Sequence, residues 1–207
     1  GVYKIGLELF CAEGPKVIDA IRDAGAPAIF LDLKLHDIPR TVARAVARLA
    51  GLGVDYLTVH TGGGAEMLSQ AANSAAGRLQ LLGVTVLTSL DQGLLADVGI
   101  TGHLSQCVLQ RAQLAVHNGI SGIVCSAHEA RELRREVGEN CVLVTPGIRL
   151  DPTRGGDQRR IMTPERALEA GAASLAGQGI PTPVDEAARS AQANTATEAV
   201  RPAPGIH

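Results

Sequence analysis

The charged residues with the clearest chemical potential lie in or beside apolar stretches of the chain. Asp32 and Lys34 are separated by one residue within the apolar segment 28–35, and Asp37 follows shortly after it. Residues two positions apart in a strand point to the same side, so the Asp32 carboxylate and the Lys34 ammonium are expected to meet. Lys4 is a lone cation in another apolar segment. Because buried charges are costly unless paired, these four residues are expected to neutralise one another in one site.

Two interpretations fit this cluster. One is a structural network of ion pairs at the end of a strand. The other is a functional site, which is favoured because several charges converge where a ligand could enter. Three of the 19 basic residues are lysines, namely Lys4, Lys16 and Lys34, and the others are arginines. In a chain so biased toward arginine, a retained lysine suggests a task that arginine cannot perform.

Apolar segments typical of strands alternate with segments of helical spacing along the chain. The predicted strands cover residues 1–7, 28–34, 54–60, 81–88, 122–126, 141–146 and 173–176. The predicted helices cover residues 15–24, 39–52, 65–76, 94–98, 103–118, 127–137 and 163–170. Such an alternation, with nearly continuous apolar strands, indicates an α/β fold with a parallel sheet covered by helices.

The arrangement could be an open doubly wound sheet or a closed (β/α)8 TIM barrel. No G-x-G-x-x-G motif follows the first strand, which argues against a dinucleotide-binding sheet. We therefore predict a (β/α)8 barrel that lacks the first strand and helix, since seven strands are counted where a barrel has eight. Residues 1–180 are expected to form this single domain, and residues 181–207 a weakly ordered segment. In a barrel, Asp32 and Lys34 would face the interior at the C-terminal mouth, where active sites lie.

Composition limits the other classes of function. The 207 residues carry a formal net charge of −2, without the basic surplus of a nucleic-acid binder. No apolar run is long enough to cross a membrane. The histidines show no spacing typical of metal ligands, so no metal site is expected. The four cysteines form no C-x-x-C pair and lie in apolar surroundings, which is typical of buried, reduced thiols in the cytoplasm.

The segment 32–42 resembles the signature of orotidine 5′-phosphate decarboxylases of the bacterial type, in which D-x-K-x-x-D-I-P is followed by threonine. Further pieces similar to the family follow in the same order. They lie at residues 4–10, 59–64, 84–89, 124–127, 145–149 and 156–160. Each piece alone is moderately specific, whereas all of them in sequence order are highly specific.

The resemblance implies a cofactor-free homodimeric (β/α)8 barrel of the cytoplasm, with no nucleic-acid or membrane partner. The family converts orotidine 5′-monophosphate to UMP and carbon dioxide in de novo pyrimidine biosynthesis. Lys34 would be the general acid that protonates C6 of the pyrimidine, because a lysine ammonium can transfer its proton whereas arginine holds its protons too tightly. Asp32 would lie beside the substrate carboxylate and orient Lys34, and Lys4 would hold Asp32. Asp37 would reach across the dimer interface into the partner's site.

The resemblance also implies a set of residues that bind the nucleotide. Without it, the two hydroxyl residues of the set could simply cap a strand end, and the loop residues could belong to a solvated loop. The expected substrate-binding residues are Ile38, Thr41, Thr88, Ser89, Arg149 and Gln158.

The sequence departs from the family pattern at both ends. The family's opening strand carries an aspartate that contacts the ribose, and this sequence has no counterpart. Where the family ends its last strand in Gly-Arg-Pro, this sequence has Gln178-Gly179-Ile180, without the arginine that binds phosphate. The first alternative is therefore a catalytically impaired homologue that still binds nucleotides. The second is a related magnesium-dependent phosphosugar decarboxylase that shares the D-x-K-x-x-D pattern, although the Ile38-Pro39 continuation and the 145–149 motif argue against it.

Overall fold

Seven parallel strands form one sheet, in which each strand pairs with the next strand in the chain. The structure is a computed structural model, and it describes residues 1–148, 162–170, 172 and 174–176. The strands are β1 Val2–Gly6, β2 Ala28–Leu35, β3 Tyr56–His60, β4 Gln80–Val84, β5 Gly122–Val124, β6 Val142–Pro146 and β7 Ser174–Ala176. Their number and parallel order confirm the predicted α/β barrel-type fold.

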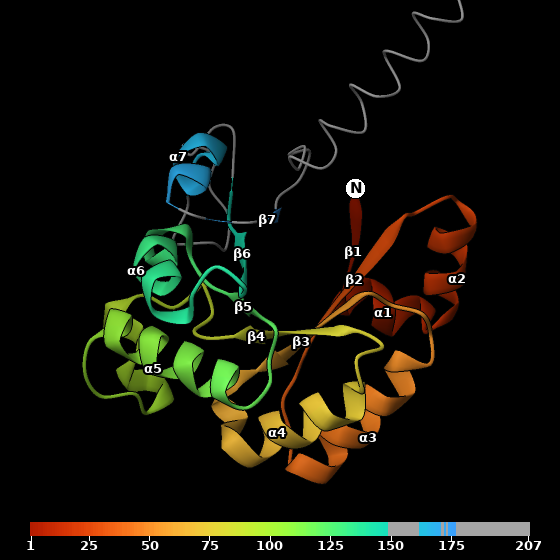
Figure 1. Ribbon diagram of the computed structural model, residues 1–207, viewed down its shortest axis with the longest axis horizontal. Coiled ribbons are helices and arrows are strands. Elements are labelled where there is room, and N and C mark those ends of the chain that lie inside the picture. Colours follow the sequence, from red (N-terminus) through yellow and green to blue (C-terminus); the bar gives the residue numbers. More distant parts are fainter. Residues whose placement is uncertain (149–161, 171, 173, 177–207) are drawn as a thin grey trace, which may run out of the picture.

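Helices connect the strands and lie on the outer side of the curled sheet (Figure 1). They are α1 Leu7–Glu13, α2 Lys16–Asp23, α3 Pro39–Ala50, α4 Gly64–Ala75, α5 Leu104–His117, α6 Ala127–Val137 and α7 Pro164–Glu169. β1 and β7 form the two ends of the sheet, and within the described residues each of them pairs with one neighbour.

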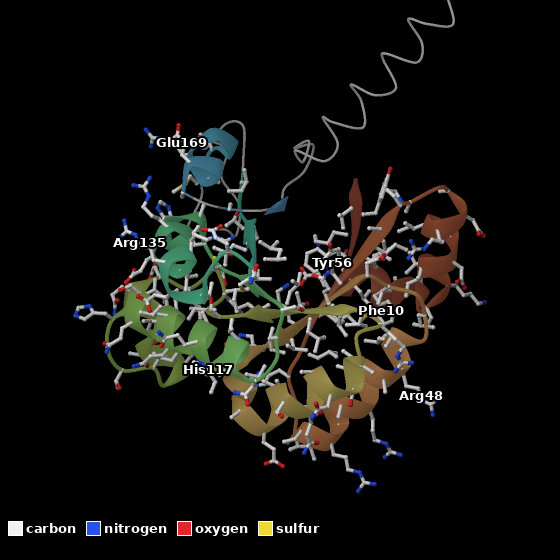
Figure 2. The ribbon with its side chains drawn as sticks, viewed as in Figure 1. Phe10, Arg48, Tyr56, His117, Arg135 and Glu169 are labelled. Atoms are coloured by element: carbon white, nitrogen blue, oxygen red, sulfur yellow. The ribbon has the colours of Figure 1, made fainter. Side chains whose placement is uncertain are left out.

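Alternate strand residues belong to two separate apolar clusters. The larger cluster lies between the sheet and the helices and includes Ile29, Leu31 and Leu57. The smaller one lies on the inner side of the sheet, around Phe30, with Tyr56 packed against it, and the two rings meet edge to face with centroids 6.4 Å apart. Figure 2 shows Tyr56 on this inner side. Because side chains alternate along a strand, residues two positions beyond Phe30 and Tyr56 also face the interior, nearer the C-terminal ends.

Two predicted strands end earlier than expected. β4 stops at Val84 rather than Thr88, because β5 offers partners for Leu82–Val84 alone and the chain then turns, with the Leu90 amide bonded to the Leu87 carbonyl. β5 stops at Val124 because Ser126 caps the next helix. The Ser126 hydroxyl accepts from the His128 amide, and the Glu129 carboxylate accepts from the Ser126 amide at 2.8 Å.

Two helical predictions also need correction. The first strand ends at Gly6, and the helix α1 that begins at Leu7 was not predicted. The helix expected over 94–98 is replaced by two short 3-10 turns, Gln92–Leu94 and Ala96–Val98. The Asp91 side chain accepts from the Gly93 and Leu94 amides and so starts the first of these turns.

The four cysteines are free. Cys125 and Cys141 are buried, and burial raises the pKa of the Cys141 thiol. Cys107 is half-buried, whereas Cys11 on α1 is exposed, so the expectation of four buried thiols is wrong for Cys11. None of the helices within the described residues has the length and hydropathy needed to cross a membrane. The segment predicted to be weakly ordered, 181–207, lies outside the described residues, as do the last residues assigned to the barrel domain.

We expect Gly122→Ala to destabilise the sheet. A Cβ atom at Gly122 would lie 2.6 Å from Leu82 Cδ2 and 2.9 Å from the Val142 carbonyl oxygen, so the backbone of β6 would have to move. Overpacking of this kind costs about 1–3 kcal/mol, and thermal unfolding should show a lower Tm. Gly93→Ala is the matched control, because its new Cβ would have Asp91 Oδ1 at 3.4 Å as its nearest contact. Equal Tm values for the two variants would contradict this account of β5.

Candidate active site

Asp32 and Lys34 form an ion pair on the inner side of β2. The Lys34 ammonium lies 2.9 Å from both Asp32 carboxylate oxygens. The Asp32 side chain is 17% exposed and that of Lys34 is 40% exposed, so the carboxylate is the more buried partner of the pair. The contact expected from the i, i+2 spacing is therefore present. An ammonium has three N–H donors, and this pairing leaves one of them for a ligand.

Lys4 supplies a second cation to the same carboxylate. Its ammonium lies 3.7 Å from Asp32 Oδ2, across the β1–β2 pair. In the register of these strands Gly6 is opposite Asp32, and Lys4 is opposite Phe30, so the lysine side chain must extend past Gly6 to reach the carboxylate. A Cβ atom at Gly6 would lie 3.3 Å from the Lys4 ammonium. Because Gly6 has no side chain, the space beside it is open to the Lys4 ammonium, which can then reach Asp32.

The backbone at Lys34 departs from a regular strand. Lys34 has φ +50°, in the left-handed region that non-glycine residues rarely adopt. Leu31 pairs with Leu57 and Leu35 pairs with Val59, so three residues of β2 are opposite one residue of β3. Such a bulge redirects a side chain, and strained backbone of this kind is concentrated at functional sites.

A fully buried threonine occupies the strand opposite the bulge. The Thr58 hydroxyl accepts from the Lys34 backbone amide at 2.8 Å and donates to Asp32 Oδ1 at 2.9 Å. Asp32 therefore has three partners on different residues. A carboxylate surrounded by two ammonium groups and a hydroxyl donor is a preorganised charge array, and such arrays stabilise charge that develops on a ligand without rearrangement of solvent.

Two stacked histidine rings lie at the ends of β2 and β3. The His36 and His60 centroids are 5.0 Å apart with an interplanar angle of 14°. His60 Nδ1 accepts from the Gly62 amide at 3.1 Å. Burial, together with the nearby His36, Arg111 and Lys34, lowers the pKa of His60 to about 4. His60 is therefore a neutral, hydrogen-bonded ring at neutral pH.

The Asp37 carboxylate is not part of the Asp32 ion-pair cluster. Its Oδ1 accepts from the Ile38 amide at 2.6 Å, and none of the described residues forms a salt bridge with it. Asp37, Ile38 and Thr41 are all exposed, and Ile38 reaches 68% exposure at the start of α3. These residues form a solvent-facing edge where the chain leaves the C-terminal end of β2 and enters α3.

The remaining predicted binding residues occupy different surroundings. Thr88 is buried and Ser89 is exposed, and both lie in the turn after β4 rather than on the strand itself. Arg149 and Gln158 lie outside the described residues. Within the part of the chain that the structure describes, no group of three or more His, Cys, Asp or Glu side chains is arranged to hold a metal ion.

Thr58 and Gly6 are the site residues that sequence reasoning missed. Thr58 lies in Tyr56-Leu57-Thr58-Val59-His60, where a threonine is an ordinary strand former. Its same-face spacing from Tyr56 was the one available signal, and it does not identify a partner on another strand. Gly6 could be interpreted only once its register opposite Asp32 was known.

We expect the free energy of unfolding to depend less on pH in His60→Asn than in the wild type. Between pH 6.5 and about 4 the unfolded histidine binds a proton and the folded one does not, so the free energy of unfolding falls as the pH falls through this window. Asparagine keeps an oxygen that can accept from the Gly62 amide and does not titrate. Urea unfolding should therefore show that the free energy of unfolding falls less between pH 7 and pH 4.5 in the variant than in the wild type. The exposed His103, changed to Asn, is the control. Equal losses for wild type and His60→Asn would contradict the assignment.

Comparison with known proteins gives one consistent result. The family model described as "Orotidine 5'-phosphate decarboxylase / HUMPS family" matches residues 1–190. A protein named orotidine 5′-phosphate decarboxylase from Thermobifida fusca (strain YX) is 50% identical over 169 residues, which cover 82% of this chain and 72% of that relative. A protein of the same name from Anaeromyxobacter sp. (strain K) is 49% identical over 172 residues, which cover 83% of this chain and 75% of the relative.

Solved structures agree with the sequence relatives. The crystal structure of orotidine 5′-phosphate decarboxylase from Lactobacillus acidophilus matches with a TM-score of 0.74 and 34% identity, and the match covers 92% of this chain and 84% of that one. The shared fold and the extent of the sequence matches lead to one conclusion: this chain belongs to the orotidine 5′-phosphate decarboxylase / HUMPS family.

Proposed function

We propose that this chain catalyses the decarboxylation of orotidine 5′-monophosphate to UMP and carbon dioxide in pyrimidine biosynthesis. Identity of about half with relatives of that name, over most of the chain, supports the reaction. The observation that carries the proposal is the Lys34 ammonium held at 2.9 Å by both oxygens of Asp32. A proton donor is thereby fixed on the interior face, at the C-terminal ends of the strands.

Lys34 is the proton donor in the proposed mechanism. The bond between C6 and the carboxylate breaks, carbon dioxide leaves, and the electron pair stays on C6. The Lys34 ammonium then gives a proton to C6, forming the C6–H bond of UMP, and water restores the ammonium. Lysine suits this step because its ammonium is a compact charge with a proton that it can transfer to a strong base such as the C6 carbanion, whereas arginine holds its protons too tightly. No cofactor takes part.

Asp32 and Lys4 prepare the site for this transfer. The Asp32 carboxylate orients Lys34 and lies beside the substrate carboxylate. Lys4, 3.7 Å away, holds Asp32 in position through charge pairing. Because these charges are fixed before the substrate arrives, the site does not have to reorganise as charge develops on C6.

The nucleotide is bound by residues around the mouth of the sheet. We assign this role to Thr88 and Ser89 in the turn after β4, where hydroxyls could hydrogen-bond the pyrimidine. Arg149 and Gln158, which belong to the segment outside the described residues, are proposed to bind the nucleotide and its phosphate. The substrate is a small molecule, with no role for nucleic acid or a membrane.

A homodimer completes the site in this proposal. Asp37 extends into the partner's site, and Ile38 and Thr41 accompany it at the interface. Two observations support this: the Asp37 carboxylate is exposed, with no salt bridge to any described residue, and Ile38 presents an apolar side chain that is 68% exposed. We assign the enzyme to the cytoplasm, where free cysteines like these four are typical.

We expect purified protein to consume orotidine 5′-monophosphate in the presence of EDTA, and Lys34→Ala to lose this activity. Removing a general acid costs about 10²–10⁴-fold, so kcat should fall by at least about a hundredfold. Loss of the orotate chromophore measures the rate. Lys16→Ala is the matched control, because Lys16 is an exposed lysine on α2, away from Asp32. A Lys34→Ala enzyme with nearly wild-type kcat would contradict the proposed role.

The same assay separates the two alternatives. A catalytically impaired homologue would bind UMP in calorimetry but release no carbon dioxide. A magnesium-dependent phosphosugar decarboxylase would act on a ketose phosphate, would need added Mg²⁺ and would lose activity in EDTA.

A mixed dimer tests the proposed role of Asp37. We expect Lys34→Ala and Asp37→Ala homodimers to be inactive when purified separately. Co-expressed subunits should form mixed dimers in which one of the two sites has both residues intact. Random assembly then restores about a quarter of the wild-type activity. Activity no greater than the sum of the two separate variants would contradict a shared site.

A further inference from the structure

One buried hydroxyl contacts both partners of the central ion pair. Thr58 on β3 is 0% exposed. Its Oγ1 accepts from the Lys34 backbone amide at 2.8 Å and donates to Asp32 Oδ1 at 2.9 Å. The Lys34 ammonium in turn donates to the same Asp32 carboxylate at 2.9 Å. The backbone of Lys34, its side chain and the Asp32 carboxylate are thus joined through a single threonine.

The bulge in β2 explains why the Lys34 amide needs this acceptor. Leu31 and Leu35 pair with Leu57 and Val59, so the residues between them on β2 have Thr58 alone opposite them. A buried amide without an acceptor loses the free energy of a hydrogen bond. The hydroxyl supplies the acceptor on the β3 side, at the residue where φ is +50°. It therefore holds the unusual backbone conformation from which the Lys34 side chain starts.

The direction of the second hydrogen bond fits the charge of the site. A hydroxyl that accepts from the amide has its proton free to donate, and Asp32 Oδ1 receives it. Hydrogen bonds to a carboxylate are stronger than neutral ones, so this contact fixes the carboxylate plane as well as the amide. Thr61, another buried threonine after a strand, bonds a backbone carbonyl instead, that of Val84 at 2.9 Å.

We propose that Thr58 is a positioning residue of the active site, whose hydroxyl holds Lys34 and Asp32 in the geometry needed for proton transfer. This inference rests on the decarboxylation proposed above. Thr58 does not touch the reacting atoms in this account. Its contribution is to the chemical step rather than to binding of the nucleotide, so its loss should lower kcat and leave KM nearly unchanged.

The test compares Thr58→Val, which keeps the shape and removes the hydroxyl, with Thr58→Ser, which keeps the hydroxyl. We expect Thr58→Val to lower kcat by about tenfold or more, with KM within about a factor of two, and Thr58→Ser to stay close to wild type. Thr61→Val is the matched control, because it also removes a buried hydroxyl from a 2.9 Å hydrogen bond and should leave kcat unchanged. Thr58→Ala replaces the valine variant if that variant does not fold.

Amide hydrogen exchange at Lys34 gives a second readout that needs no activity. We expect faster exchange in Thr58→Val and near wild-type exchange in Thr58→Ser and Thr61→Val. An unchanged kcat in Thr58→Val, or an equal loss of kcat in Thr58→Ser, would overturn the proposal. If the wild-type protein does not consume orotidine 5′-monophosphate, the proposed function fails on its own. Exchange at Lys34 then decides separately whether the hydroxyl holds this residue, and unchanged exchange in Thr58→Val overturns the inference.

Discussion

The Asp32 carboxylate, held between two ammonium groups and a hydroxyl, is the interaction on which the rest of the site depends. Its partners come from three adjacent strands: Lys4 from β1, Lys34 from β2 and Thr58 from β3. The parallel sheet in sequential order brings these residues to one place, because β1, β2 and β3 are neighbours and their carboxyl ends lie at the same edge. The register opposite Gly6 and the bulge before Leu35 then set the distances.

This arrangement is poorly explained by stability alone. A non-glycine residue in the left-handed region costs about 1–3 kcal/mol, and two lysines beside one carboxylate add mutual repulsion. Both ammonium groups are partly exposed, so solvent weakens the attraction that they gain from Asp32. The apolar layer between the sheet and the helices, which includes Leu31 and Leu57, supplies burial that offsets this cost. Strained backbone at Lys34 is what a catalytic role of this residue would explain, because such strain is concentrated at functional sites.

The sequence predicted the site correctly where the interacting residues lie on the same strand. The alternation of apolar residues with Asp32 and Lys34 predicted both the face and the ion pair, and the structure contains both. It was less informative where a contact depends on how two strands are aligned. Thr58 could not be assigned because its partners lie on β2, 24 and 26 residues earlier in the chain. The end of β4 was missed for the same reason, since the pairing of β4 with both neighbouring strands stops at Val84.

The most direct measurement of the central claim is a crystal structure of this protein with bound UMP. We expect the Lys34 ammonium still to contact both Asp32 oxygens and to lie about 3–3.5 Å from C6 of the pyrimidine, which is the separation of reacting atoms in a productive complex. We also expect the Thr58 hydroxyl to keep its two hydrogen bonds. A nucleotide whose C6 faces away from Lys34, or a Lys34 side chain that leaves Asp32 when the ligand binds, would contradict the account.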